Sequence, residues 1–458
     1  MAKDCSKRRR STRSDLKNHD ESTTTIRPSM VNEIDIISTL PDCLLCHILS
    51  FLPGKTTSVV ATTSVLSRRW RYVWKDLPTF HFTLARPYNP SNPLETFLSL
   101  RTARIFRKFH LDAHITENEL STVQSWIESA MGPTLEELQV YFSVIDIQKP
   151  LIPLPIFRCT ALVTISFCRC FSVLNHSSYH LPSLKTMTLH LESSNNIEAL
   201  LSGCPVLEFL KLDICQICPN PNPNPNKETI RVASSSLKIL DINAIYIGVV
   251  IIEEVKIDAP SLEYLHLNIP SSQLEEVSAG NLQKVQSASL IFSYVYGGYS
   301  LIELLKEIRN QRMMLLTLSE MDSIALPTYQ LMEFNHLFQL HLTVQNFSSK
   351  VVMDMLGKCR VLKDLKIVRK QKGESQGWTE PVDVPNCLVS HLEYVVFDMC
   401  LGSEEEKEFI AYILQKGLIL KGVSIYADPM GFNVEEELSL IPRASNTCYL
   451  RFHKGISC

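Results

Sequence analysis

One spacing of hydrophobic positions recurs along most of the chain, with apolar residues at the first, fourth and sixth places of a six-residue segment. Its clear copies are LEELQV at 135, LVTISF at 162, LEFLKL at 207, LKILDI at 237, LEYLHL at 262, LFQLHL at 337, LKDLKI at 362 and LEYVVF at 392. Looser copies are LKTMTL at 184, LQKVQS at 282 and MLLTLS near 313. Because alternate side chains of a strand share a face, each copy predicts a short strand with one buried side.

Copies that recur every 20 to 31 residues have the signature of leucine-rich repeats. One such repeat cannot bury its apolar face, whereas stacked repeats form a continuous core. We therefore expect an α/β fold in which residues 131–376 form an irregular solenoid with a parallel sheet, each strand returning through a helix or turn. Leucines scattered through an ordinary α/β domain are a weaker alternative. CPNPNPNPNK at 218–227 predicts an exposed, polyproline-like loop, since alternating proline prevents helix and sheet ladders.

A helical block precedes the repeats at 35–75. In DIISTLPDCLLCHILSFL we expect Thr39 to cap a helix with Pro41 in its first turn, where proline costs no hydrogen bond. Pro53-Gly54 ends this helix, and Ser67 is placed to cap a further short helix that carries Trp70. Three short helices make a small core. The block is therefore either an N-terminal cap of the repeats or a module that a partner protein completes.

LPGKTTS at 52–58 superficially matches the end of a phosphate-binding loop. That loop requires G-x-x-x-x-G-K-[ST], but the first glycine position is Leu49, and Pro53 removes a backbone N–H. A nucleotide hydrolase is therefore disfavoured, and we interpret the stretch as the connection between two helices.

LPDCLLCHILSFLP…TSVLSRRWRYVW resembles an F-box of the plant type. The resemblance implies that the block docks on a Skp-family adaptor and, through it, on a cullin. The contacts that it implies are Leu40, Pro41, Leu44, Ile48, Leu49, Leu52, Leu66 and Trp70. One departure is that TTSV occurs at both 56–59 and 62–65, which gives about three more residues than the family usually has. Three helical residues turn a helix by about 300°, so its register is nearly kept if the extra residues are helical.

WTEPVDVPNCLVSHLEYVVFDM at 378–399, the following EEEKEFIAYILQKGLILKGVSIY and the late PRASNTCYLRF resemble an FBD domain. The resemblance implies an α+β unit, which we expect to close the end of the solenoid. A helix is predicted to begin at Glu404-Glu405-Glu406, because acidic residues suit the N-terminal end of a helix dipole. Gly417 and Gly422 are unusual for the family and are expected to shorten that helix.

The composition adds few constraints on function. A net charge of −3 selects neither nucleic acid nor membrane, and the longest aliphatic run, IYIGVVII, is too short to span a bilayer. The 14 cysteines are expected to be reduced thiols of a cytoplasmic or nuclear protein. Their doublets suggest zinc, but most occupy repeat positions instead, so no metal or other cofactor is expected. No histidine accompanies a nucleophile and an acid in a recognisable motif, so no catalytic residue is assigned.

The expected organisation is a disordered basic tail at 1–33, an F-box at 34–80, a linker and solenoid cap at 81–130, repeats at 131–376 and an FBD domain at 377–458. Lys7-Arg8-Arg9-Arg10 is either a nuclear-import signal or a solvated charge cluster.

Together the resemblances imply the substrate-recognition subunit of an SCF-type cullin ubiquitin ligase, with an unknown target protein. The alternative is a repeat scaffold that acts outside a ligase. Solvent-facing strand positions, which include His190 and Asp213, are expected to line the concave face. Those predicted to bind the target are Glu137, Lys211, Tyr264, His266, His341 and Lys366.

Overall fold

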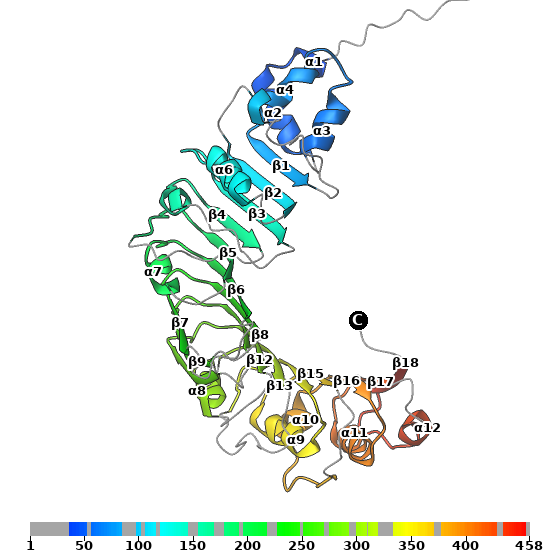
Figure 1. The fold of residues 1–458 in the computed structure, drawn as a ribbon. Coiled ribbons are helices and arrows are strands. Elements are labelled where there is room, and N and C mark those ends of the chain that lie inside the picture. Colours follow the sequence, from blue (N-terminus) through cyan, green and yellow to red (C-terminus); the bar gives the residue numbers. More distant parts are fainter. Residues whose placement is uncertain are drawn as a thin grey trace, which may run out of the picture.

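The computed structural model describes residues 36–52, 56–84, 98–101, 106–115, 120–144, 154–168, 178–191, 196–217, 227–247, 251–269, 274–292, 299–308, 310–318, 333–370, 377–427 and 434–454. A 15-stranded parallel sheet runs through the molecule and forms the inner side of a curved solenoid (Figure 1). The N-terminal helices lie at one end of the curve, and the C-terminal helices lie at the other. The expected α/β solenoid with a helical N-terminal module is therefore confirmed.

The strands follow one another in chain order, except where a second sheet intervenes. In the large sheet they are β1 (Thr79–Leu84), β2 (Lys108–Ile115), β3 (Glu137–Val144), β4 (Thr164–Cys168), β5 (Thr186–Leu191), β6 (Phe209–Ile217), β8 (Ile239–Ile247), β10 (Tyr264–Ile269), β12 (Ser287–Phe292), β13 (Met313–Leu318), β14 (Gln339–Val344), β15 (Asp364–Arg369), β16 (Tyr394–Cys400), β17 (Gly422–Ala427) and β18 (Tyr449–Lys454).

Buried and partly exposed residues alternate along these strands, so one face of the sheet packs into the core and the other faces solvent. In β10, for example, Leu265, Leu267 and Ile269 are buried, while the residues between them are partly exposed. Equivalent leucines of neighbouring repeats are paired in register, as Leu240 is with Leu265. The buried rows therefore stack into one hydrophobic core that extends from Phe80 to Cys448. This is the continuous core that stacked repeats require.

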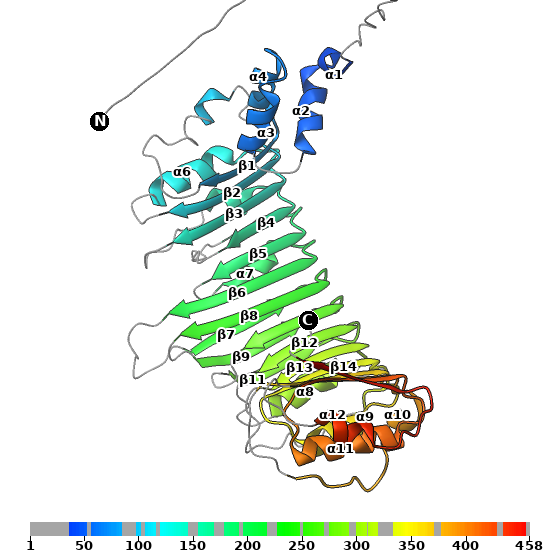
Figure 2. The same ribbon diagram turned by 90° about the vertical axis from the view of Figure 1, so that its right-hand side faces the viewer.

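The outer side of the solenoid carries helices and a smaller sheet (Figures 1 and 2). Its helices are α6 (Leu120–Ala130), η3 (Leu154–Arg158), α7 (Ile197–Ser202), α8 (Tyr299–Glu307) and α9 (Ser349–Lys358). The smaller sheet consists of β7 (Lys227–Ala233), β9 (Ile251–Asp258) and β11 (Leu274–Gly280), which pair in parallel. Three consecutive repeats thus return through a strand, where the sequence analysis expected a helix or turn. Alternating β-branched residues such as Ile230 and Val232 favour a strand there.

Two of the looser copies were placed in the wrong register. Leu265 is paired with Ala288 in the next strand, so the repeat predicted at 282 begins at Val285. Met314 is paired with Ala288, so the repeat predicted near 313 begins at Gln311. Gln311 is fully buried where other repeats have leucine, and Ala288 replaces the first strand leucine. Because a polar residue and a small residue replace leucine at these positions, the hydrophobic pattern of these two repeats was too weak to give their register.

The N-terminal block consists of α1 (Ile36–Thr39), α2 (Asp42–Ser50), α3 (Thr56–Thr63), α4 (Trp70–Val73) and η1 (Trp74–Asp76). Thr39 ends α1 and does not cap the next helix, because Pro41 occupies the N-cap position of α2. The Ser67 hydroxyl accepts a hydrogen bond from the Trp70 amide, over 3.5 Å. The first TTSV lies within α3 and the second begins in it.

The C-terminal segment extends the solenoid with α10 (Asn386–Ser390), α11 (Glu404–Lys416), α12 (Val434–Ser439) and strands β16 to β18. As predicted, the three glutamates begin α11, and Gly417 follows its last residue. Of the predicted polyproline-like loop at 218–227, only Lys227 is described, and it begins β7. The predicted basic tail at 1–33 lies outside the described residues. Within the described part, no helix is long and apolar enough to cross a membrane.

Candidate functional site

The first candidate surface is the outward side of α2. Leu45, Cys46 and Leu49 point inward from this helix into a core that also contains Trp70, Val73 and Trp74. Leu44 and Ile48, one helical turn apart, remain 46% and 41% exposed. A helix with apolar residues on both sides buries only one of them, so its other side is available to a partner.

The eight adaptor contacts implied by the resemblance divide into two groups. Pro41, Leu44, Ile48, Leu52 and Leu66 are exposed. Leu49 and Trp70 are buried inside the N-terminal core, and Leu40 is partly buried against it. The buried residues shape the module, whereas the exposed ones offer apolar surface.

Sequence reasoning did not select every apolar residue on this side. Phe51 is 73% exposed and lies seven residues after Leu44, two helical turns along the same side. Val65 and Tyr72 are also exposed. Helical spacing from Leu44 was the signal that could have found Phe51.

The position of α2 is fixed by polar contacts. Arg69 Nε donates a hydrogen bond to Asp42 Oδ1 over 2.8 Å, which joins the start of α4 to the start of α2. Cys46 Sγ donates to the Val73 carbonyl over 3.3 Å, so this thiol fills the core. Burial raises the pKa of Cys46 to about 11, assisted by nearby Asp76, and keeps the thiol protonated.

The second candidate surface is the concave face of the large sheet. All six residues predicted to bind a target lie there at partly exposed strand positions: Glu137, Lys211, Tyr264, His266, His341 and Lys366. They do not form one cluster, because they extend from β3 to β15. Lys211 and His266 lie in the middle, and His341 is paired with Lys366 nearer the C-terminal end.

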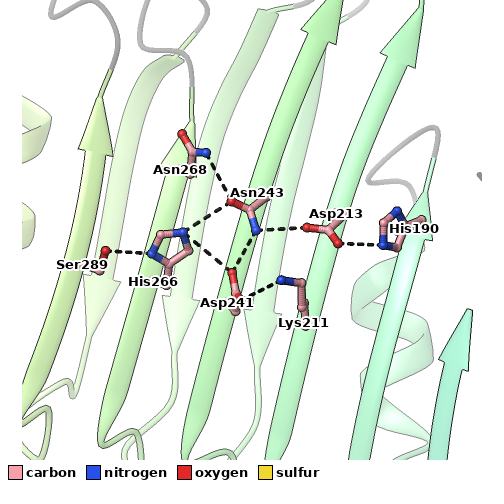
Figure 3. Close-up of polar contacts among 8 residues, drawn as sticks. All are labelled: His190, Lys211, Asp213, Asp241, Asn243, His266, Asn268 and Ser289. Carbon is pink, nitrogen blue, oxygen red and sulfur yellow. Dashed lines mark hydrogen bonds and ion pairs between the residues drawn. The ribbon is translucent and has the colours of Figure 1, made fainter. Parts of the chain in front are cut away.

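The middle of the concave face carries a central polar network of eight residues (Figure 3): His190, Lys211, Asp213, Asp241, Asn243, His266, Asn268 and Ser289. Asn243 is its centre, since its amide nitrogen donates to Asp213 Oδ1 over 3.0 Å and to Asp241 Oδ1 over 3.1 Å. The Asn243 amide oxygen accepts from Asn268 over 3.2 Å.

Ion pairs complete the central polar network. Lys211 Nζ is 3.2 Å from Asp241 Oδ2, and His190 Nε2 is 2.7 Å from Asp213 Oδ2. Burial alone would lower the pKa of His190, but hydrogen bonds to Asp213 and Cys168 raise it to about 9. His266, in contrast, has a lowered pKa because burial dominates. At neutral pH the network therefore combines charged His190 with neutral His266.

Sequence reasoning placed four of these eight residues on the solvent-facing side of the strands, including His190 and Asp213, and missed the other four. The predicted list contained Lys211 and His266, but not their partners Asp241 and Asn243. The same alternation that marks Lys211 also marks residues two places further along each strand. The side-by-side placement of Cys168, His190 and Asp213 on β4, β5 and β6 could not be read from the sequence, because it depends on strand register.

Comparisons with known proteins agree with this architecture. Residues 37–82 match the F-box domain model, residues 123–289 match the model described as FBD-associated F-box protein At5g56370, LRR repeats, and residues 380–425 match the FBD model. The chain is 30% identical to the probable FBD-associated F-box protein At1g32375 of Arabidopsis thaliana over 440 residues, covering 92% of this chain and all of the relative.

The chain belongs to the FBD-associated F-box proteins with leucine-rich repeats. It is also 31% identical to the F-box/FBD/LRR-repeat protein At3g52680 of Arabidopsis thaliana over 468 residues, covering 93% of this chain and 95% of that protein. Proteins that combine an F-box with leucine-rich repeats and an FBD domain are generally non-enzymatic adaptors, and this combination suggests a substrate-adaptor role in SCF-type ligases. The outward side of α2 and the concave face are therefore considered as surfaces that bind proteins.

Proposed function

We propose that this F-box protein is the target-recognition subunit of an SCF-type ubiquitin ligase. The outward side of α2 binds a Skp-family adaptor, which connects it to a cullin, and the concave face holds the target. Such a subunit changes no covalent bond itself. It raises the effective concentration of a target lysine near the charged ubiquitin-conjugating enzyme.

The observation that carries this proposal is the division of α2 between two environments. Leu45 and Leu49 complete the small core of the F-box, which is distinct from the solenoid core within the described residues. Leu44, Ile48 and Phe51 face away from it and stay exposed. An apolar helix side at i, i+4 and i+7 spacing fits the groove of a partner protein.

Binding to a purified Skp-family adaptor tests the docking surface. We expect Leu44→Ala combined with Ile48→Ala to weaken adaptor binding roughly tenfold or more, because central apolar contacts dominate interface energies. Both residues are exposed, so the variant should fold and keep its circular dichroism spectrum. Binding isotherms by biolayer interferometry measure the effect.

Leu418→Ala combined with Leu440→Ala is the matched control. These leucines are also exposed but lie in the FBD region, so adaptor binding should not change. Wild-type protein that does not bind the adaptor at micromolar concentration would favour the other function, a repeat scaffold outside a ligase. Equal loss in both double variants would contradict docking through α2.

The target surface is tested without knowing the target. Proximity labelling with a proteasome inhibitor present should identify proteins that are lost with Lys211→Glu, which reverses a charge in the central polar network. Lys284→Glu is the control, because this exposed lysine lies in the turn before β12 and outside the network. Identical labelling by both variants would place target binding elsewhere.

A further inference from the structure

The central polar network continues beyond Figure 3 to a cysteine. Cys168 ends β4, and the register of β4 with β5, in which Phe167 is paired with Leu189, places Cys168 beside His190. His190 Nε2 is in turn 2.7 Å from Asp213 Oδ2 on β6. Cys168, His190 and Asp213 therefore form a row across three adjacent strands, and all three are partly exposed on the concave face.

This row has the arrangement that activates a thiol. A carboxylate holds the imidazole, and the imidazole takes the thiol proton, so that a thiolate lies beside an imidazolium. The hydrogen bond from His190 lowers the pKa of Cys168, against the effect of burial, and a further hydrogen bond from Ser166 assists. The thiolate, not the thiol, is the reactive nucleophile.

Every strand packed against Cys168 contributes a polar neighbour. The groups that face it are Tyr141 on β3, Ser166 on β4 itself, His190 on β5, and Lys211 and Asp213 on β6. Lys211 and His190 favour the thiolate, whereas Asp213 opposes it electrostatically. The interaction with His190 is the largest of the effects on the Cys168 pKa, and the effect of Asp213 is smaller.

An open hollow gives reagents access to this thiol. It has a volume of 380 Å³ and is lined by Cys168, Ser166, Tyr141, Gln139, Asp112 and His110, among others. Two described thiols of neighbouring repeats, Cys159 and Cys204, differ from Cys168. Burial raises the pKa of Cys159, whose Sγ lies 3.6 Å from the Gly132 carbonyl, and burial raises the pKa of Cys204 to about 12.

We propose that Cys168 is a site of reversible modification, at which its thiolate exchanges with a small disulfide such as glutathione disulfide. The Cys168 sulfur attacks one sulfur of the reagent, the S–S bond breaks, and a new S–S bond forms to Cys168. The released glutathione thiolate takes a proton from the His190 imidazolium or from water. Cys168 is thereby oxidised to a mixed disulfide, one glutathione is reduced to thiol, and an added thiol reverses the exchange.

The modification would place a bulky, charged group beside the central polar network. A consequence for target binding rests on the proposed function of the concave face. The chemical reactivity does not, because it is measured on the isolated protein. If Cys168 reacts but the protein captures no target, the modification proposal is supported and the proposed target binding is contradicted.

Incubation with glutathione disulfide at pH 6.5, followed by trypsin digestion and mass spectrometry, tests the site. Cleavage after Arg158 and Arg169 leaves Cys159 and Cys168 on one peptide, so fragment ions compare the two thiols directly. We expect Cys168 to be modified at least about tenfold faster than Cys159, because its thiolate is present at lower pH. Equal rates would overturn the proposal.

His190→Gln tests the mechanism. It should slow the modification of Cys168 at least about fivefold at pH 6.5, with most of the loss recovered near pH 9, where an unassisted thiol ionises. His180→Gln removes an exposed histidine outside the row and should change nothing. An unchanged Cys168 rate in His190→Gln would overturn the proposal. Modification of buried Cys204 as fast as Cys168 would also overturn it, because it would show reaction through unfolding.

Discussion

Glu404, Glu405 and Glu406 begin α11, but their environments differ. Glu404 is exposed and pairs with Lys407, as expected for an acidic residue at a helix N-terminus. Glu405 is buried and accepts hydrogen bonds from the amide and hydroxyl of Ser349, both over 2.7 Å. Glu406 is buried and pairs with Arg369 over 2.7 Å. The sequence predicted the helix start from charge alone, but two of the three glutamates attach α11 to α9 and β15.

Glu406→Gln should destabilise the protein by about 3–5 kcal/mol, because the charge of Arg369 would stay buried without its anionic partner. Glutamine keeps the shape of the side chain, and its amide oxygen can still accept from the Ser403 amide. Urea unfolding followed by circular dichroism measures the change. Glu404→Gln is the matched control on the same helix and should leave the midpoint unchanged; similar midpoints for both variants would contradict the buried pair.

At the scale of elements, the periodic spacing of hydrophobic residues predicted the strands of the large sheet, because these strands are determined by their local sequence pattern. Strong copies such as LEYLHL and LKDLKI became strands at the expected positions, since their buried leucines alternate with polar residues. The pattern did not predict the outer sheet of β7, β9 and β11, because those segments pair only with each other, across repeats. For the same reason it placed candidate residues on the concave face but not into the central polar network, which depends on register between strands.

Contacts between consecutive repeats also explain why residue 203 is a glycine, which the spacing of hydrophobic residues does not predict. Gly203 follows α7 and has an ordinary negative φ of −82°, so it is not required for backbone conformation. Its carbonyl accepts a hydrogen bond from the Leu181 amide over 2.9 Å. A Cβ at this position would lie 2.5 Å from the Tyr179 carbonyl oxygen. Close approach of two backbones therefore requires glycine here.

Gly203→Ala should destabilise the protein by about 1–3 kcal/mol, because backbone atoms must move to admit the methyl group. Gly357→Ala is the control, since a Cβ there meets no atom within 4 Å. Gly357 lies inside α9, where alanine is the better helix former, so this variant should be neutral or more stable. Thermal unfolding compares the two variants, and equal losses of stability would contradict the close contact at Gly203.

At the scale of the whole molecule, the described residues form two hydrophobic cores of very different size. The solenoid core is continuous through the repeats and the FBD region, whereas the F-box has its own core around Leu45 and Trp70. Contacts between them include the Thr56 hydroxyl, which accepts from the His81 amide over 2.7 Å, and Arg101, which donates to the Leu77 carbonyl over 2.7 Å. Within the described residues the buried apolar side chains of the two cores form separate clusters, so the F-box should be able to unfold locally while the solenoid stays folded.

Hydrogen exchange measured by mass spectrometry tests this independence. Leu45→Ala removes a fully buried side chain from the F-box core at a cost of about 2–5 kcal/mol. We expect faster exchange in residues 36–77 and unchanged protection in β3 to β15. Leu265→Ala removes an equally buried leucine from β10 and should instead accelerate exchange in the neighbouring strands β8 and β12, because each repeat is stabilised by its neighbours. Faster exchange throughout the solenoid in Leu45→Ala would show that the two cores unfold as one unit, and the proposed docking surface on α2 would then be coupled directly to the stability of the concave face.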